Sequence, residues 1–198
     1  MSSFRMSLGV GFALSATVFL VACASPTRPA ATQQKDEIPV PDEPVIMKIT
    51  SSAFTNGGMI PLKYTCDGEN VNPPLSFSGI PKDARSLVLI MEDPDVPISI
   101  REDGMWDHWV VFDIPATLTR VEENQQPSGI SGKGSTDKLN YKGPCPPDQH
   151  RYYFKLFALD AFLYLPEGST KSEVMEAMEG HVISEAELMG RYDRTINE

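Results

Sequence analysis

Apolar runs interrupted by proline and glycine define the elements of this chain. Residues 86–92, SLVLIME, form an unbroken apolar run, which predicts a strand buried on both faces. A second run, RYYFKLFALDA from Arg151, follows a segment with three prolines that cannot be a helix or an interior strand. A third apolar run, residues 106–114, stops at Pro115. Shorter strands are expected at 45–50, 59–65 and 75–78. The tail 181–194 could continue a helix or pair as a last strand, and we favour the strand.

One helix is predicted near the C-terminus. Thr170 and Glu173 have the spacing of a capping box, and the helix should end at about Glu179. Three apolar side chains are expected on its buried face: Val174, Met175 and Met178. Residues 117–138 are polar and glycine-rich, so they are expected to cross the surface as a loop. Many short strands and no alternation of strand with helix predict a mostly β fold, an antiparallel β-sandwich with a few short helices.

The N-terminus has the pattern of an export signal. Residues 1–22 carry Arg5 and then a stretch without charge that is too short and too weakly apolar to predict a spanning helix. The run ends in Leu20-Val21-Ala22-Cys23, which resembles the lipobox of bacterial lipoproteins. That resemblance implies cleavage before Cys23 and acylation of its thiol. An ordinary secretory signal cut near Ala22 is the alternative.

Residues 23–44 then form a proline-rich tether without apolar periodicity, so the folded domain is expected at 45–198. By resemblance to bacterial lipoproteins, the Ser25 that follows Ala24, rather than an Asp, favours the outer membrane, facing the periplasm, over the inner membrane. The net charge of −10 argues against a nucleic-acid partner, because no basic stripe could meet phosphates. An acidic domain is also repelled by an anionic leaflet, so attachment to the bacterial cell envelope would depend on the lipid.

Three cysteines allow two interpretations. With Cys23 lipidated, Cys66 and Cys145 form an even pair in an oxidising compartment, and we favour a disulfide between them. The alternative is a nucleophilic Cys145 with His150 as its base, five residues away.

Polar residues gather at the ends of the strong strands. Asp93 and Asp95 follow one strand, His108 lies within the next, and His150 precedes the third. Each has an ordinary structural interpretation: Asp-Pro pairs initiate turns, and a lone core histidine needs one hydrogen-bond partner. Together with the GPCPP segment at 143–147 they form a constellation.

That constellation resembles the phosphatidylethanolamine-binding proteins (PEBPs), also called the Raf kinase inhibitor protein family. Four motifs carry the resemblance: Asp93-Pro94-Asp95-x-Pro97, His108-Trp109-Val110-Val111, Tyr141-x-Gly143-Pro144-x-Pro146-Pro147 and His150-Arg151-Tyr152. The surrounding sequence, such as Tyr64-Thr65-Cys66-Asp67-Gly68, is similar to the bacterial branch of YbhB and YbcL. The resemblance covers about residues 45–194.

The resemblance implies a PEBP-like β-sandwich with a shallow pocket for phosphate-like anions or phosphorylated head groups. Carried over by motif, the expected ligand-binding residues are Asp93, Asp95, His108, Tyr141, Pro144, His150 and Tyr152. It implies no cofactor and no metal. Arg151 should point away from the pocket if Tyr152 points into it. The sequence departs from the family pattern at 132–140, which leaves ligand selectivity open.

Three functions compete at this stage. The first is a non-catalytic binding protein for a phosphate-containing small molecule or lipid head group, anchored to the membrane through its lipid. The second is an inhibitor or regulator of a protease or a kinase, with the protein partner unknown. The third is a hydrolase that uses Cys145 and His150, or a metal-assisted site of Asp93, His108 and His150. No glycine elbow or HExxH motif supports the third.

Overall fold

Two antiparallel sheets and one helix carry the fold of the computed structural model, which describes residues 46–196. These residues belong to one compact unit, 41–198. The predicted signal peptide (1–22), the lipidation site Cys23 and the tether (23–44) lie outside the described residues. Within the described part, no helix is long and apolar enough to span a bilayer.

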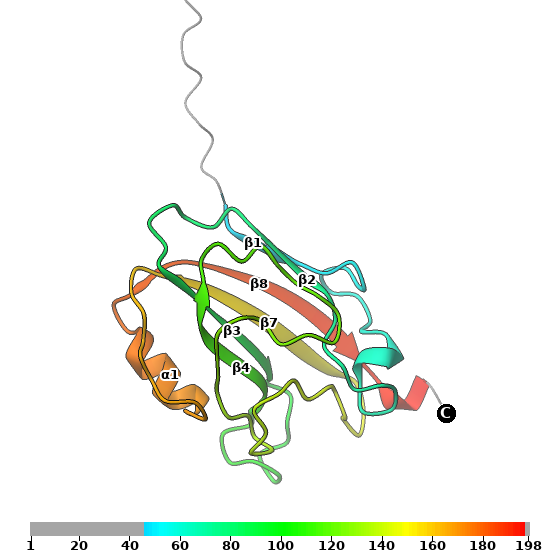
Figure 1. Ribbon diagram of the computed structural model, residues 1–198. Helices are drawn as coiled ribbons and strands as arrows, with labels where there is room; N and C mark the ends of the chain where they lie inside the picture. The colour runs from blue at the N-terminus through cyan, green and yellow to red at the C-terminus, as the bar shows by residue number, and fades with distance from the viewer. Residues whose placement is uncertain (1–45, 197–198) are drawn as a thin grey trace, which may run out of the picture. The chain divides into compact units, whose positions relative to one another are not determined.

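The smaller sheet has the order β1-β2-β5 and the larger one β6-β4-β3-β7-β8 (Figure 1). The smaller sheet consists of β1 (Lys48–Thr50), β2 (Leu75–Ser78) and β5 (Arg120–Val121). The larger sheet consists of β3 (Ser86–Asp93), β4 (Trp106–Pro115), β6 (Ile130–Ser131), β7 (His150–Leu159) and β8 (Val182–Tyr192). Helix α1 spans Lys171–Met178, and two short 3₁₀ helices, η1 and η2, span Leu62–Tyr64 and Arg194–Ile196. The predicted mostly β, two-sheet fold is confirmed.

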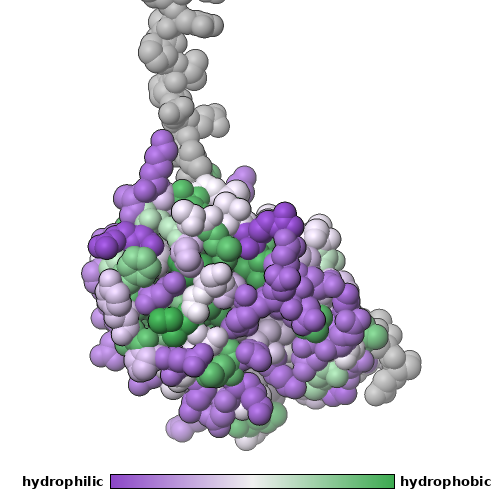
Figure 2. All heavy atoms as spheres, in the orientation of Figure 1, coloured by the Kyte–Doolittle hydropathy of each residue, from purple (hydrophilic) through white to green (hydrophobic). Residues whose placement is uncertain are grey.

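The central strand β3 is buried on both faces, as its unbroken apolar run predicts. Leu89 and Met91 pack into the core between the two sheets. The alternate residues Val88 and Ile90 pack in a second core with α1. The larger sheet is therefore the middle layer of three, and side chains at the end of β3 can reach either neighbouring layer. On the face drawn in Figure 2 hydrophilic residues dominate, with separate hydrophobic patches between them.

Helix α1 begins at the predicted capping box. The Thr170 side chain accepts from the Glu173 N–H, and the Glu173 carboxylate accepts from the Thr170 N–H. Val174 and Met178 are buried, but Met175 is 41% exposed, so its assignment to the buried face is wrong. Residues at i and i+4 share a face, whereas the residue after i is turned about 100° away.

Two further differences concern the strands. The strand expected at 59–65 is wrong: Met59 forms a single bridge with Arg191, and the chain then turns through η1. Pro61 fixes the entry to this turn, and the Thr65 hydroxyl donates to the Leu62 carbonyl, which closes it. The loop expected at 117–138 carries the two-residue strands β5 and β6. The tail is confirmed as a strand, because β8 pairs with β7 along its length.

Candidate functional site

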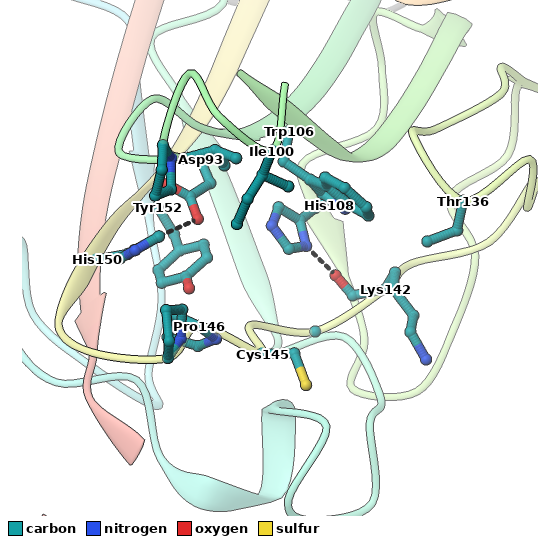
Figure 3. A pocket seen from close by; sticks show the side chains of 14 residues that line it. Asp93, Ile100, Trp106, His108, Thr136, Lys142, Cys145, Pro146, His150 and Tyr152 are labelled. Atoms are coloured by element: carbon teal, nitrogen blue, oxygen red, sulfur yellow. Dashed lines mark hydrogen bonds and ion pairs between the residues drawn. The ribbon is translucent and has the colours of Figure 1, made fainter. Parts of the chain in front are cut away.

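A cavity of about 170 Å³ lies where β3 ends and where β4 and β7 begin (Figure 3). Four of the residues expected from the sequence line it: Asp93, His108, His150 and Tyr152. The apolar part of the wall comes from Val96, Pro97, Ile100, Trp106, Pro146 and Pro147. Pockets for drug-sized ligands measure roughly 300–1,000 Å³. This cavity therefore has room for a phosphate-sized group and a few neighbouring atoms.

A β-bulge aims His108 at the cavity. Met91 of β3 pairs with Trp109, but the next residue, Glu92, pairs with Asp107, so His108 is an extra residue in β4. Bulges of this kind re-aim a side chain and are frequent beside functional sites. Asp107 keeps its place on the α1 side of the sheet, where its carboxylate contacts Lys171. His108 is turned towards Tyr152 of β7, at a ring-centroid distance of 5.3 Å.

Two hydrogen bonds hold His108 against the segment that precedes the prolines. The Lys142 N–H donates to the His108 carbonyl at 3.1 Å. The His108 Nδ1 lies 2.6 Å from the Lys142 carbonyl oxygen. A carbonyl only accepts, so Nδ1 carries the proton in this contact. Burial lowers the pKa of His108 to about 4, although the Lys142 carbonyl and Asp93 act in the opposite direction.

Asp93 holds the second histidine. Its Oδ2 accepts from Nδ1 of His150 at 2.7 Å, and its Oδ1 accepts from the backbone N–H of Asp95 at 2.8 Å. Both Asp93 and His150 are about 95% buried. The other ring nitrogen of His150 lies 3.1 Å from the exposed carboxylate of Asp148. The ring orientation of His150 is therefore set by carboxylates on two sides.

Tyr152 contributes a buried hydroxyl to the same cavity. The residue is fully buried, and its hydroxyl forms no hydrogen bond of standard geometry among the described residues, although the Asp93 carboxylate lies near enough to interact with it. Burial and the nearby charge of Asp93 raise its pKa, so it stays protonated at all physiological pH values. Figure 3 shows the hydroxyl on the side of the ring that faces Pro146. This hydroxyl can donate to an acceptor bound in the cavity.

Three residues of the expected ligand set do not line the cavity. Asp95 faces outward and forms a bidentate ion pair with Arg151, at 2.6 and 2.9 Å. Arg151 thus points away from the cavity while Tyr152 points towards it. Tyr141 is buried in the core, where its hydroxyl donates to the Tyr64 carbonyl at 2.8 Å. Pro144 is also absent from the lining, and its carbonyl accepts from the Cys66 N–H.

Asp95, Tyr141 and Pro144 support the residues of the cavity wall but do not line the cavity. In the Tyr-x-Gly-Pro motif this support depends on Gly143. Gly143 has to be a glycine, because a Cβ at this position would overlap the Tyr64 carbonyl. Its N–H donates to the Asn70 side chain at 2.8 Å, so it is not available to a ligand. The Tyr-x-Gly-Pro motif therefore docks the proline segment onto the loop after η1.

A disulfide joins the same two segments. Cys66 and Cys145 are bonded, with a Cα–Cα distance of 5.4 Å and a sequence separation of 79. Cys145 is part of the cavity wall. A bonded sulfur cannot act as a nucleophile, so this geometry contradicts the interpretation of Cys145 and His150 as a catalytic pair.

Outside the sequence motifs, the remaining wall residues were not expected from the sequence. Thr136 comes from the 132–140 segment, the one that departs from the family pattern. Lys142 also belongs to the wall, and Figure 3 shows its side chain extending away from His108. Ile100 and Trp106 add apolar side chains to the wall. The stacking of an arginine, Arg101, on the Trp106 ring was not visible in the sequence.

A buried charge cluster supports the cavity from the α1 side. The Glu92 carboxylate lies 2.6 Å from Lys155 and 2.8 Å from Lys171, and Lys171 lies 2.7 Å from Asp107. Burial alone would raise the pKa of Glu92, but hydrogen bonds from the two lysines outweigh it and lower the pKa. Glu92 and Asp107 directly precede Asp93 and His108. Through them α1 is tied to the two strand ends that form the cavity.

Among the described residues, no group of three or more His, Cys, Asp and Glu side chains is arranged to hold a metal ion. Asp93 and His150 contact each other, and the proton on Nδ1 of His108 is engaged by a carbonyl. The side chains of Asp93, His108 and His150, considered above as metal ligands, are thus engaged in hydrogen bonds within the protein.

The fold and the site define a class of protein: a two-sheet β-sandwich with a small cavity at one end of its larger sheet. A family model described as phosphatidylethanolamine-binding protein matches residues 50–193. The UPF0098 protein of Chlamydia trachomatis is 50% identical over 149 residues, covering 75% of this chain and 99% of that protein. The UPF0098 protein of Methanothermobacter thermautotrophicus is 48% identical over 155 residues, covering 75% and 99%.

Solved structures agree with these relatives. The crystal structure of a putative phosphatidylethanolamine-binding protein homologue from Chlamydia trachomatis has a TM-score of 0.73 and 49% identity, covering 75% of this chain and 98% of that one. Escherichia coli YbcL, described as a member of the mammalian PEBP family, has a TM-score of 0.68 and 27% identity, covering 74% and 98%. The chain therefore belongs to the phosphatidylethanolamine-binding protein family, whose members are in general non-catalytic binding proteins.

Proposed function

We propose that the chain binds a phosphate-like anion or a phosphorylated head group in the cavity and does not transform it. The observation that supports this most directly is the buried Tyr152 hydroxyl, a donor at the cavity that forms no hydrogen bond of standard geometry among the described residues. Buried polar groups are nearly always hydrogen-bonded to protein, ordered water or an ion, so this donor can serve a bound anion. His150 and Tyr152 approach the ligand from β7, and His108 approaches it from β4.

The rest of the wall limits what the ligand can be. Of the described residues, Lys142 is the one lysine or arginine of the wall and its side chain extends away from His108, while Asp93 and the nearby Asp148 are carboxylates. A site with this balance binds a singly charged group better than a highly charged one. The apolar residues Ile100 and Trp106 then contact an alkyl group next to the phosphate. A small phosphate ester fits both parts of the wall.

Replacing Tyr152 by Phe tests the proposal. We expect Tyr152→Phe to weaken phosphate binding by about tenfold or more, because a hydrogen bond to a charged group contributes about 1.5–3 kcal/mol. The same change keeps the buried aromatic ring, so the stability of the free protein should change by no more than about 1.5 kcal/mol, the net contribution of one hydrogen bond. Calorimetric titration with phosphate and urea denaturation measure the two effects.

Two controls make this test specific. Tyr153→Phe alters the neighbouring residue of β7, which does not line the cavity, and should leave phosphate binding unchanged. In the wild type, NMR signals of the His108 and His150 rings should shift during a phosphate titration. Unchanged signals of both rings at millimolar phosphate would refute the proposed function.

We further propose that the domain is held at the bacterial envelope by acylation of Cys23, on the outer membrane and facing the periplasm. The lipobox-like sequence before Cys23 supports this, together with a disulfide that suits an oxidising compartment. Cells grown with labelled palmitate should label the wild-type chain and not Cys23→Ser. Equal labelling of both would contradict the anchor.

A second candidate, regulation of a protease or a kinase, stays a prediction. The observation that favours it is a loop at the cavity rim on which Ile98 is 80% and Ile100 63% exposed, since a partner protein would bury such side chains. Inhibition of a purified periplasmic protease by the wild type and not by Ile98→Asp would support it. An equal effect of both proteins would contradict a role for this loop.

A further inference from the structure

His108 presents a hydrogen-bond acceptor to the cavity. Its Nδ1 proton is engaged by the Lys142 carbonyl, so in the neutral ring Nε2 carries a lone pair. Figure 3 shows this second nitrogen on the side of the ring that faces Tyr152 and His150. The ring cannot flip without losing its 2.6 Å contact to the Lys142 carbonyl, and the bulge in β4 fixes the backbone behind it.

None of the groups that face His108 changes the role of its Nε2 as a hydrogen-bond acceptor. Asp93 faces it from β3, His150 and Tyr152 face it from β7, and Lys142 from the loop before β7. Both oxygens of Asp93 already accept hydrogen bonds. A fully ionised oxoanion would therefore place an oxygen lone pair against the Nε2 lone pair. An oxoanion that keeps one proton would instead donate an O–H to Nε2.

We infer that the cavity selects phosphate groups that retain one proton, which are inorganic phosphate and phosphomonoesters, over phosphodiesters and sulfate, and that His108 determines this selection. The inference rests on the proposed function and deepens it by naming the class of phosphate bound. In the complex, Nε2 of His108 accepts from the ligand O–H, while the Tyr152 hydroxyl donates to another ligand oxygen.

The ratio of affinities depends on whether the ligand or His108 supplies the proton in the hydrogen bond between them. A ligand that has neither an O–H nor an N–H can hydrogen-bond to Nε2 only if His108 itself takes up a proton. Because the pKa of His108 is about 4, protonation at pH 5.5 lowers the apparent affinity roughly 30-fold. A phosphomonoester, with a second pKa of about 6, is mostly in its singly protonated form at that pH and escapes this penalty.

Four ligands at pH 5.5 test the selection by calorimetry: inorganic phosphate, methyl phosphate, dimethyl phosphate and sulfate. We expect the first two to bind about 30-fold tighter than the last two. Sulfate or dimethyl phosphate binding within threefold of phosphate would overturn the inference and leave the proposed function standing. Failure of both inorganic phosphate and methyl phosphate to bind would overturn the proposed function, and the inference with it.

A second measurement needs no variant. Long-range ¹H–¹⁵N spectra of the histidine rings should show His108 protonated at Nδ1 and unprotonated at Nε2, both free and with methyl phosphate bound. A proton on Nε2 in either state would overturn the inference. The variant His108→Gln places an amide N–H₂ near Nε2, so the preference for phosphate over sulfate should fall below about threefold; an unchanged preference would again count against His108.

Vesicles distinguish a lipid from a soluble source of the same chemistry. The head group of phosphatidic acid is a phosphomonoester, whereas that of phosphatidylcholine is a diester without an O–H or an N–H. Vesicles of phosphatidylcholine with phosphatidic acid should displace methyl phosphate if the cavity takes a lipid, and should leave it bound if it takes a soluble ester. Displacement by pure phosphatidylcholine would overturn the selection.

Discussion

The buried neutral imidazole of His108 should make the free energy of unfolding decrease as the pH falls from 6.5 to about 4. In the unfolded chain the ring has its ordinary pKa of 6.5, and in the folded protein burial lowers the pKa to about 4. Above pH 6.5 the ring is neutral in both states and contributes no pH dependence. Between pH 6.5 and pH 4 the unfolded state binds the proton and the folded state does not, so stability falls as the pH falls.

The magnitude follows from the difference between the two pKa values. Each unit is worth 1.36 kcal/mol, so a shift from 6.5 to about 4 corresponds to about 3 kcal/mol. This is a large part of the roughly 5–15 kcal/mol by which a typical domain is stable. Several carboxylates, including Glu92, also titrate towards the lower end of this range, so the wild type alone cannot isolate the histidine.

The variant His108→Asn isolates the contribution of the histidine to the pH dependence of stability. The asparagine amide can still donate to the Lys142 carbonyl but does not titrate. Urea unfolding of both proteins from pH 7.5 to pH 4, followed by tryptophan fluorescence, gives their stability difference at each pH. We expect the wild type to lose about 3 kcal/mol relative to the variant on acidification. Packing defects in the variant do not depend on pH and cancel in this comparison. Parallel pH curves would refute the buried neutral ring.

Three further predictions concern stability. Replacing Cys66 and Cys145 by Ala opens a loop with a sequence separation of 79 and should cost about 4.5 kcal/mol in urea titrations; a loss below about 1 kcal/mol would contradict this account. Lys171→Met removes one of two cationic partners of Glu92 and should cost about 3 kcal/mol at pH 7. Because the pKa of Glu92 is lowered, this stabilisation is present above its ordinary value of 4.5 and lost on acidification, so the Tm values of variant and wild type should converge below that pH. Thr170→Ala should lower the free energy of unfolding by about 1 kcal/mol, and Thr170→Ser should restore it.

Most of the fold could be predicted because its main elements are encoded locally. The continuous apolar run of β3 and the capping box at Thr170 each have one physical interpretation, and both elements form where expected. The strand expected at 59–65 failed because its apolar residues serve the core from a turn, with Ile60 and Tyr64 both buried. Strands β5 and β6 have two residues each, too few for any periodicity.

The site was predictable to the extent that motifs coincide with strand ends. Asp93, His108, His150 and Tyr152 lie at such ends, and pairing of β3 with β4 and β7 brings them together. The bulge that turns His108 depends on the register between two strands, which no single segment encodes. Ile100, Trp106 and Lys142 reach the cavity only through tertiary packing. Tyr141 belongs to the same motif as the cavity wall, but the side chain serves the core.

The disulfide has a consequence for the order in which this molecule matures. The sheets are held by backbone pairing and apolar packing, whereas the wall at Cys145 is also held by its bond to Cys66. A newly made chain with free thiols can therefore assemble the sandwich, but it holds the proline segment through noncovalent contacts such as the Gly143–Asn70 hydrogen bond. Oxidation to the disulfide adds a covalent link between the two segments at the cavity wall. Protein purified from a reducing cytosol would lack this link.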